Sequence, residues 1–234
     1  MKTNSVLLTF LILSSAFPGS APAEGPSAVP SIALLSKVIL DVTRKDDAAD
    51  WRKAARGDIL NSGNKVKTGE KSLAVVKFKD NSMIRVRELS ELTIGATQQG
   101  GAFSKSVQIE TGVVGFSISK QQRNEEFRFT SPTSVASVRG TQGVIVSSPS
   151  ADTLTVTEGL VAFTNVISSQ SSDVAAGYTG ISTPDGRLVT RPSTPAERNA
   201  AEDVLRSGGQ EKKLDLELRD NRGTTKHLRI DFKD

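Results

Sequence analysis

Short apolar runs rich in β-branched residues recur along most of the chain, separated by Gly, Asn, Asp and Ser. Many of these runs alternate apolar with polar positions, which is the period of a half-buried β-strand. The runs lie at residues 32–42, 72–79, 83–87, 91–94, 107–109, 113–118, 127–130, 135–138, 144–146, 154–156, 160–163 and 174–181. Many short strands between regular turn signals predict an all-β fold.

An internal echo narrows the choice of architecture. Residues 109–116 (IETGVVGF) match residues 156–163 (VTEGLVAF) in apolar pattern, glycine and phenylalanine, and a shorter copy, VKTG, ends at Gly69. The shared glycines Gly69, Gly112 and Gly159 lie 43 and 47 residues apart. A unit that returns to the same kind of turn is typical of a winding chain. We therefore expect a rolled or solenoid-like β domain, with a β-sandwich as the alternative.

A basic stretch surrounds Asn81. A hairpin centred on this residue would put Phe78 opposite Ile84 and Lys77 opposite Arg85. Like charges directly opposite each other are unfavourable. Either an acidic neighbour intervenes, or the two runs do not pair as this simple hairpin.

The basic residues Lys77, Lys79, Arg85 and Arg87 form a candidate stripe for an anionic ligand. The simpler interpretation is a solvated strand face, because strands alternate polar with apolar positions by default. The formal net charge of +4 permits an anionic partner without requiring one.

The sequence changes character at Pro184 and predicts a short C-terminal helix. Thr194 supplies a capping hydroxyl, Pro195 suits the first helical position and Glu197 completes a capping box. Two consecutive glycines beginning at Gly208 end the helix.

A β-hairpin is expected after the helix. Its apolar residues, Leu214, Leu216, Leu218, Leu228, Ile230 and Phe232, alternate with charged residues. Pairing Leu216 with Ile230 would place Glu217 opposite Arg229. Two strands alone are unstable, so the helix and hairpin are interpreted as a lid or edge extension of the β domain.

The amino terminus has the features of a secretory signal. Lys2 precedes an apolar run at residues 6–13, and the small residues around Pro22 suit cleavage after Ala23. The run is shorter than the roughly 20 residues of a membrane-spanning helix. We expect a periplasmic or secreted mature protein with no transmembrane segment. The predicted organisation is a signal peptide at 1–23, a linker at 24–35, the β domain at 36–183 and the C-terminal extension at 184–234.

The composition argues against much enzyme chemistry. With no cysteine and one histidine, the chain has no disulfide, thiolate zinc site or catalytic cysteine. The histidine, His227, falls on the charged face of the expected hairpin. The acidic residues Asp46, Asp47 and Asp50 lack the spacing of a calcium loop and are interpreted as a polar loop.

Other function classes are also weighed. Aromatic residues make up 5% of the chain, too few for the stacking surfaces of nucleic-acid-binding proteins. A pair of carboxylates from distant strands is the hydrolytic arrangement that stays open. We expect no catalytic residue, no metal or other cofactor, and no nucleic-acid partner.

Several motifs, in their order along the chain, resemble the FecR domain family of bacterial envelope proteins. They are Trp51, residues 56–60 (RGDIL), 66–69 (VKTG), 78–82 (FKDNS), 138–141 (VRGT) and 156–159 (VTEG). The resemblance runs from about Ser36 to Ile181. The family-motif residues are Gly57, Asp58, Thr68, Gly69, Arg139, Gly140, Thr141, Glu158 and Gly159, and we interpret them as structural rather than catalytic.

Arg139 is the motif residue for which two roles are weighed. Its planar donors are expected to form a buried clip with a carboxylate such as Glu158. The alternative is a guanidinium that faces a ligand.

The family resemblance also carries a functional implication. The namesake regulators span the membrane: a cytoplasmic segment acts on a sigma factor, and the FecR domain outside senses a signalling domain of an outer-membrane transporter. Here the expected cleavable signal replaces the cytoplasmic segment, which implies a stand-alone secreted form. We expect a non-catalytic signalling module that binds another envelope protein. The alternative is a module that binds an envelope glycan or another anionic polymer.

Overall fold

The computed structural model describes residues 31–47, 49–99, 102–121, 125–209, 212–219 and 225–232. The expected signal peptide and the first part of the expected linker lie outside these residues. The end of that linker is part of the fold, because strand β1 (Ser31–Ile39) begins there and pairs with two other strands.

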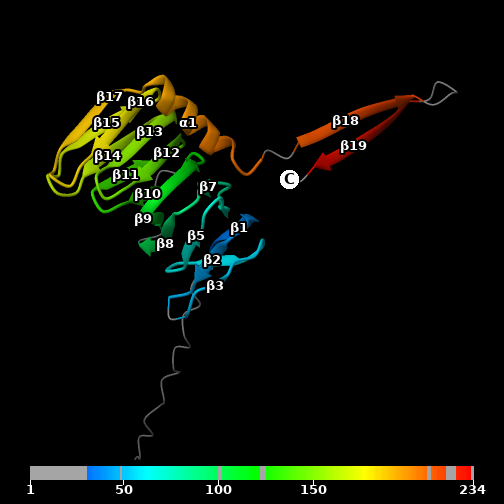
Figure 1. Ribbon diagram of the computed structural model, residues 1–234, viewed down its shortest axis with the longest axis horizontal. Helices are drawn as coiled ribbons and strands as arrows, with labels where there is room; N and C mark the ends of the chain where they lie inside the picture. The colour runs from blue at the N-terminus through cyan, green and yellow to red at the C-terminus, as the bar shows by residue number, and fades with distance from the viewer. Residues whose placement is uncertain are drawn as a thin grey trace, which may run out of the picture.

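In the described part of the chain, the main body is one hydrogen-bonded sheet of 17 strands folded into two layers (Figure 1). Layer A contains, in spatial order, β4 (Ile59–Asn61), β1, β6 (Leu73–Phe78), β7 (Met83–Val86), β9 (Ala102–Ser117), β12 (Gln142–Ser147), β13 (Asp152–Glu158), β16 (Tyr178–Ser182) and β17 (Leu188–Pro192). Layer B contains β3 (Arg52–Lys53), β2 (Val42–Lys45), β5 (Lys65–Thr68), β8 (Glu91–Gln99), β9, β10 (Glu126–Thr130), β11 (Ser134–Val138), β14 (Leu160–Asn165) and β15 (Ser171–Ala175). Strand β9 belongs to both layers, its first half to B and its second half to A. The all-β prediction is confirmed.

The core lies between the layers, where many of the strands bury alternate residues. Phenylalanine rings from the two layers meet there. Phe78 lies edge-on to Phe127 with ring centroids 5.0 Å apart, and the rings of Phe116 and Phe129 are 4.9 Å apart. All four residues are at most 2% exposed. Aromatic pairs at these distances are favourable, so the rings hold the layers together.

The chain crosses between the layers at residues with positive φ. These residues are Leu40, Gly57, Gly63, Lys71, Leu89, Gly112, Gly140, Gly159 and Gly177. The glycines of the internal echo all mark such crossings: Gly69 follows β5, Gly112 lies at the bend of β9, and Gly159 joins β13 to β14. A Cβ on Gly112 would lie 2.1 Å from Ser90 Oγ, so this bend requires glycine. The repeated crossings agree with the expected rolled architecture.

Some predicted strands are divided in the structure and others are joined. The run at residues 32–42 breaks at Leu40, between β1 and β2, and the run at residues 174–181 breaks at Gly177, between β15 and β16. The two runs on either side of Gly112 are parts of the single strand β9. Strands β9 and β10 pair in parallel, and the other described pairs are antiparallel.

The β6–β7 hairpin differs from the expected register by two residues. The expected pairing of Phe78 with Ile84 is wrong, because Ile84 lies opposite Val76, while Phe78 is the last residue of β6. Asn81 takes a φ of 65° in this turn, as a tight hairpin loop with a left-handed residue requires. Arg85 therefore lies opposite Val75 rather than opposite a lysine.

Helix α1 (Pro195–Arg206) forms as predicted. Its capping box is complete: Glu197 N donates to Thr194 Oγ1 at 3.2 Å, and Thr194 N donates to Glu197 Oε2 at 2.8 Å. Arg191 donates to both carboxylate oxygens of Glu197, at 2.7 and 2.9 Å. The hydrogen bond from Arg191 is the main reason why the pKa of Glu197 falls to about 2.

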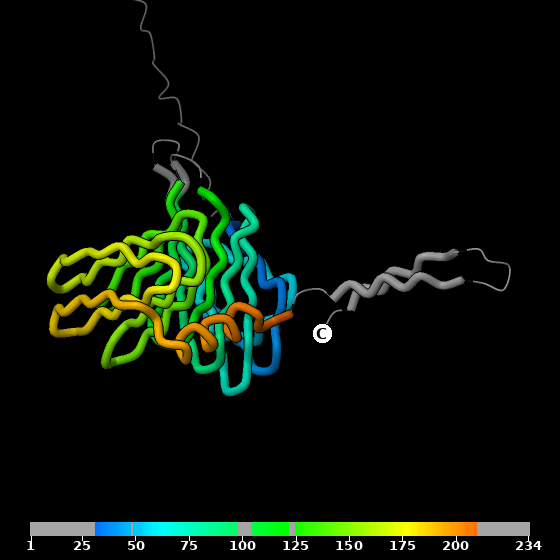
Figure 2. Tube along the Cα trace, turned by 90° about the horizontal axis from the view of Figure 1, so that it is seen from above, coloured from blue at the N-terminus to red at the C-terminus, as the bar shows by residue number. Residues whose placement is uncertain are grey.

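Helix α1 lies against the outer face of layer A, over β9, β12 and β13 (Figures 1 and 2). Gly115 of β9 allows this close approach, because a Cβ there would lie 2.8 Å from Val204 Cγ1. At the end of the helix, Arg85 Nε donates to Ser207 O at 3.0 Å. The helix is therefore an outer cover of layer A.

Strands β18 (Lys212–Arg219) and β19 (Thr225–Phe232) form a separate two-stranded sheet. Leu216 pairs with Leu228, so the expected pairing of Leu216 with Ile230 is wrong. A shift of two residues keeps every residue on the same face. The apolar pattern alone therefore does not choose between these registers.

Candidate interaction surface

The motif residues around β5 hold backbone crossings together. Thr68 is 2% exposed, and its Oγ1 donates to Arg87 O at 2.5 Å and accepts from Ser90 N at 3.1 Å. Gly69 N donates to Asp41 O at 2.8 Å. These hydrogen bonds connect three neighbouring crossings, β1–β2, β5–β6 and β7–β8.

The motif residues Gly140, Thr141 and Gly159 lie at the opposite edge of the body. A Cβ on Gly159 would lie 2.3 Å from Thr141 Cγ2. Thr141 O accepts from Ile118 N at 2.9 Å. These contacts join the β11–β12 and β13–β14 crossings to the end of β9.

The expected clip between Arg139 and Glu158 is wrong. Both residues are exposed, and Glu158 Oε2 accepts from Gln142 Nε2 at 2.7 Å. Arg139 follows the buried Val138, so strand alternation places it on the outer side. Its charge acts on Glu126 instead: burial alone would raise the pKa of Glu126, but neighbouring hydrogen bonds and positive charges, including Arg139, lower it.

Gly57 and Asp58 lie at the β3–β4 crossing. Asp58 Oδ2 accepts from Ala55 N at 3.1 Å and lies 3.8 Å from Arg44 Nη1. Arg44 is 5% exposed and also donates to Asp46. This hydrogen bond is the main cause that lowers the pKa of Asp46. The carboxylate of the predicted acidic loop is thus paired with a buried arginine.

The structure divides the candidate basic stripe. Lys77 and Lys79 are exposed. Arg85 is half-buried, burial lowers its pKa, and its hydrogen bond to Ser207 O places a cation at the C-terminal end of α1. Cations are favourable at that end of a helix, so Arg85 holds α1 on layer A. Arg87 lies in a neighbouring depression.

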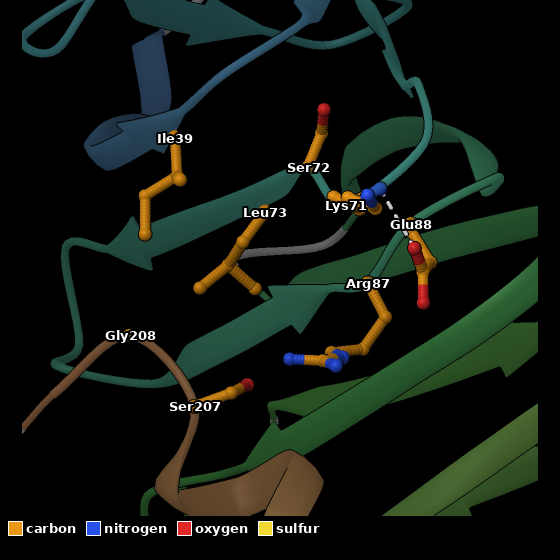
Figure 3. Close-up of a pocket in the computed structure, with 8 residues that line it drawn as sticks. All are labelled: Ile39, Lys71, Ser72, Leu73, Arg87, Glu88, Ser207 and Gly208. Atoms are coloured by element: carbon orange, nitrogen blue, oxygen red, sulfur yellow. Dashed lines mark hydrogen bonds between the residues drawn. The ribbon is translucent and has the colours of Figure 1, made fainter.

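This depression has a volume of about 370 Å³ and lies between the end of α1 and the crossings around Gly69 (Figure 3). Its lining residues are Ile39, Lys71, Ser72, Leu73, Arg87, Glu88, Ser207 and Gly208. Glu88 Oε2 accepts from Lys71 N at 2.7 Å, which directs this carboxylate to the backbone. Within the described residues, the Arg87 guanidinium has no hydrogen-bond or ion-pair partner. The depression therefore presents a positive group to an incoming acceptor.

Two exposed leucines stand on the same edge as this depression. Leu40 and Leu89 are 65% and 62% exposed, and their φ angles are 57° and 54°. They flank the β5–β6 crossing, because Leu89 N donates to Gly69 O at 3.2 Å while Gly69 N donates to the residue after Leu40. A left-handed backbone costs about 1–2 kcal/mol for an L-residue. Packing in the monomer offsets little of this cost.

We name Leu40, Lys71, Arg87 and Leu89 the corner surface. Sequence reasoning missed both leucines, because a left-handed conformation is expected of Gly, Asn or Asp rather than of a bulky residue. The sequence carries no clear signal for this conformation, because Leu40 lies inside an apolar run and Leu89 stands among polar residues that are typical of an ordinary turn. Lys71 was missed for the same reason, since its φ is 55°.

A buried ion pair near the β6–β7 turn was also missed. Lys105 is 4% exposed, and its Nζ donates to Asp80 Oδ2 at 2.8 Å. Burial alone would raise the pKa of Asp80, but hydrogen bonds from Gln121, Lys105 and Ser82 lower it. The group joins β9 to the turn and is enclosed, so we assign it to the fold rather than to the surface.

The described ranges contain no candidate metal-binding cluster and no membrane-spanning helix. No group of three or more His, Asp or Glu residues in these ranges could hold a metal ion. None of the helices found there has the length and apolar character needed to cross a bilayer.

Comparison with known proteins gives one family match. Residues 64–162 match the model of the family described as FecR protein. This match covers β5 to the first part of β14, so it includes the motif residues from Thr68 to Gly159, whereas Gly57 and Asp58 lie before it. No curated protein matches the sequence.

Two solved structures are similar at low sequence identity. Both are crystal structures of a protein named a putative anti-sigma factor from Parabacteroides distasonis ATCC 8503, at 1.65 and 2.50 Å resolution. Each is 11% identical to this chain, with TM-scores of 0.48 and 0.49. The matched region covers 58% of this chain and 63% and 62% of the two neighbours, so the chain spans less than two thirds of their length.

Proposed function

Since this chain carries a FecR domain at residues 64–162, we propose that it acts as a non-catalytic, extracytoplasmic protein-interaction module of the bacterial envelope. The bound partner in this proposal is another envelope protein, and the role is in signalling. The corner surface is the proposed contact site.

The observation that carries this proposal is the pair of exposed, left-handed leucines. Bulky residues held in sparsely populated backbone conformations cluster at binding sites, where the rest of the fold maintains the strain. Leu40 and Leu89 are both more than 60% exposed, so their apolar surface is available to a partner. Isolated exposed leucines are ordinary. Two of them on neighbouring crossings, both with strained backbones, are not.

The charges beside the leucines define the chemistry of the partner. Arg87 and Lys71 supply positive charge, and the nearby Glu88 carboxylate already accepts from the backbone. A protein segment with an apolar side chain next to an acidic one would match this arrangement. Interfaces of this kind have an apolar centre and a polar rim in which arginine is favoured.

The proposed compartment follows from the predicted signal peptide. Cleavage near Ala23 would release a mature chain into the periplasm or beyond it. A chain without cysteine is compatible with an oxidising compartment, where disulfides are allowed but not required.

The test is affinity capture of the tagged mature protein from envelope extracts, at about 0.1 M and about 1 M salt. The key variant is the double substitution Leu40→Gly/Leu89→Gly. Glycine accepts a positive φ, so this variant removes apolar surface without disturbing the crossings. The control is Ile167→Ala, because Ile167 is also 62% exposed but lies in the β14–β15 turn.

We expect a protein partner that remains bound at high salt, is retained by Ile167→Ala and is lost in the double glycine variant. A partner that binds the double variant as well as the wild type would contradict the assignment of the corner surface. Circular dichroism of each variant distinguishes loss of binding from loss of fold.

The second candidate is binding of an envelope glycan or another anionic polymer. The observation that favours it is the exposure of Lys77 and Lys79 on the outer side of layer A. Binding of this kind weakens steeply with ionic strength. It would be lost at high salt and in a Lys77→Gln/Lys79→Gln variant, and the corner substitutions would leave it unchanged.

A further inference from the structure

Helix α1 lies over one row of outward-facing residues that crosses the strands of layer A. Each member of this row pairs with the next: Arg85, Gly115, Val144, Thr155, Thr179 and Arg191. Arg85 Nε donates to Ser207 O at the C-terminal end of the helix. Near the start of the helix, Arg191 donates to Glu197. We name this row the helix row; an arginine stands at the end where α1 stops.

A second row lies beside it, two residues farther along each strand. Its members are Arg87, Val113, Val146, Thr153, Ile181 and Val189. Arg87 belongs to this row because its backbone N donates to Val113 O at 2.9 Å, and the other members pair directly from strand to strand. Alternate residues of a strand share a face, so both rows are on the outer side of layer A. We name the second row the open row.

The open row is apolar and accessible. Val146 and Val189 are exposed, while Val113 and Ile181 are half-buried. The row on the opposite side of α1 differs, because there Ser117 pairs with Gln142 and Gln142 pairs with Glu158. Adjoining apolar side chains on a surface are typical of an interaction site. The outer face of layer A therefore offers such a site on one side of α1 and a polar surface on the other.

Arg87 stands at the end of the open row as Arg85 stands at the end of the helix row. Arg87 lines the depression beside Ser207 and Gly208 (Figure 3), and Lys71 lines it as well. Among the described residues, no hydrogen bond or ion pair engages the Arg87 guanidinium. Cations favour the C-terminal end of a helix, where the last carbonyl groups lack partners within the helix. The open row thus has both features of the row that already holds a helix: small or apolar residues across the strands and an arginine at one end.

We propose that the open row binds an amphipathic helix of a partner protein, which lies alongside α1 with its C-terminal end at Arg87. The matching group on the partner is an acidic side chain in the last turn of that helix, since Arg87 and Lys71 are both positive. This inference rests on the proposed function, because it specifies the segment that the protein partner brings to this chain.

The geometry favours a helix over an added strand. Strands β9, β12, β13 and β16 are paired on both sides in layer A, so they offer a partner side chains and no free backbone edge. Alternate residues of a strand are about 7 Å apart, and packed helices lie about 8–10 Å apart. A helix on the open row would therefore also contact α1. Five strand spacings separate Arg87 from Val189, and this distance of about 24 Å is spanned by an α-helix of about 16 residues.

The test uses a synthetic amphipathic peptide of about 16 residues, with leucines at helical spacing and glutamates in its last turn. The control peptide has the same composition, with the glutamates in its first turn. Fluorescence anisotropy measures the binding of each labelled peptide to the full exported chain. We expect a Kd of about 10–100 µM for the first peptide and binding about tenfold weaker for the control, which lacks a carboxylate beside Arg87.

Substitutions on the two sides of α1 locate the peptide. Val146→Asp should weaken binding at least tenfold, because it buries a charge under the apolar stripe of the peptide. The control Ser117→Asp adds the same carboxylate to the same face on the polar side of α1 and should leave binding unchanged. Val189→Asp, in the outer strand β17, should also weaken binding, and it keeps the test informative if Val146→Asp unfolds the chain.

A charge exchange tests the direction of the bound helix. Arg87→Glu should weaken the peptide with glutamates in its last turn about tenfold. The same variant should bind a peptide with lysines in that turn better than the wild type does. An arginine with a merely structural role would not produce this exchange of preference.

Three outcomes would overturn the proposal. The first is a wild-type chain that does not bind the peptide at about 1 mM. The second is an equal effect of Val146→Asp and Ser117→Asp. The third is a wild-type dimer in sedimentation velocity that Val146→Asp dissociates, which would assign the open row to a second copy of the chain.

The corner variant separates this proposal from the proposed function. Leu40→Gly/Leu89→Gly leaves the open row unchanged and should bind the peptide as the wild type does. Loss of the captured envelope protein in that variant, together with normal peptide binding, would support both assignments. A captured partner that is indifferent to Val146→Asp would overturn the helix site and leave the proposed function intact.

Discussion

The bend of β9 offers a matched pair of substitutions that separates backbone conformation from close packing. Gly112 and Gly177 both cross between the layers with positive φ, 107° and 82°. A Cβ on Gly177 meets no atom within 4 Å, whereas a Cβ on Gly112 would lie 2.1 Å from Ser90 Oγ and 2.5 Å from Ser90 Cα. Gly177→Ala therefore changes the backbone preference, and Gly112→Ala adds a collision with a neighbouring backbone.

The two effects have different magnitudes. Alanine at a positive φ costs about 1–2 kcal/mol in the folded state, and the lower entropy of the unfolded chain returns about 0.4–1 kcal/mol. We expect Gly177→Ala to lose about 1 kcal/mol. In Gly112→Ala, overpacking adds about 1–3 kcal/mol. Displacing Ser90 also weakens its hydrogen bonds with Val113 N (2.9 Å) and Glu88 O (3.1 Å), at about 1 kcal/mol each.

The expected loss for Gly112→Ala is therefore about 3 kcal/mol greater than for Gly177→Ala. Urea denaturation followed by circular dichroism measures both free energies of unfolding, and equal m-values would show that the comparison is sound. If the two variants differ by less than about 1 kcal/mol, the layer crossing at Gly112 is not as tightly packed as the structure has it. The interpretation of the repeated glycines as tight layer crossings would then be wrong as well.

Three more predictions concern the corner, the helix cap and the stripe. Leu89→Gly should match or exceed wild-type stability, because relief of about 1–2 kcal/mol of backbone strain offsets the lost contacts. The control is Leu160→Gly, because Leu160 is 52% exposed but has no positive φ. In urea denaturation, Leu160→Gly should lose about 1–2 kcal/mol of stability. Glu197→Gln should cost about 1 kcal/mol at pH 7 after solvent screening. Because the pKa of Glu197 in the folded protein is depressed to about 2, the carboxylate stabilises the fold above pH 4.5 and loses this effect toward pH 2. The difference in unfolding free energy between wild type and Glu197→Gln should therefore shrink as the pH falls over that range. Arg85→Met should cost about 1 kcal/mol and speed hydrogen exchange in the last turn of α1, where its bond to Ser207 O is lost; unchanged exchange would refute its role as a clamp.

Local signals in the sequence were enough to predict helix α1. Thr194, Pro195 and Glu197 act within one turn, so their capping interactions do not depend on the rest of the fold. The all-β body was also predictable, because strand alternation is local. The echo glycines Gly112 and Gly159 were recognisable for the same reason: each position has a backbone or packing requirement that glycine alone meets.

The failures concern contacts between distant parts of the chain. Arg85 looked like part of a surface stripe, but its partner Ser207 is 122 residues away. Glu158 looked like a partner for Arg139, but the register of β12 and β13 brings Gln142 to it instead. Neither the charges nor the order of residues along the chain predicts which residues these partners are.

The predicted registers of both hairpins were wrong by two residues, for the same reason. A shift of two preserves the apolar and polar faces, so burial cannot distinguish the alternatives, and the turn decides. In the β6–β7 turn the decisive feature is the left-handed Asn81. The strained leucines of the corner surface were beyond prediction, because the tertiary fold imposes the conformation of Leu40 and Leu89 against their own preference.

Strand β9 divides the body into two halves, and this division bears on how chains of this fold can gain or lose strands. Strands β1 to β8 lie on one side of β9 in both layers, and strands β10 to β17 lie on the other. The described backbone ladders of the two halves meet only at β9. Strands can therefore be added to either outer end of the body, or removed from it, without changing the strand pairs next to β9. The family match at residues 64–162 covers the strands nearest β9, whereas the outer strands β1 to β4 and β15 to β17 lie outside it.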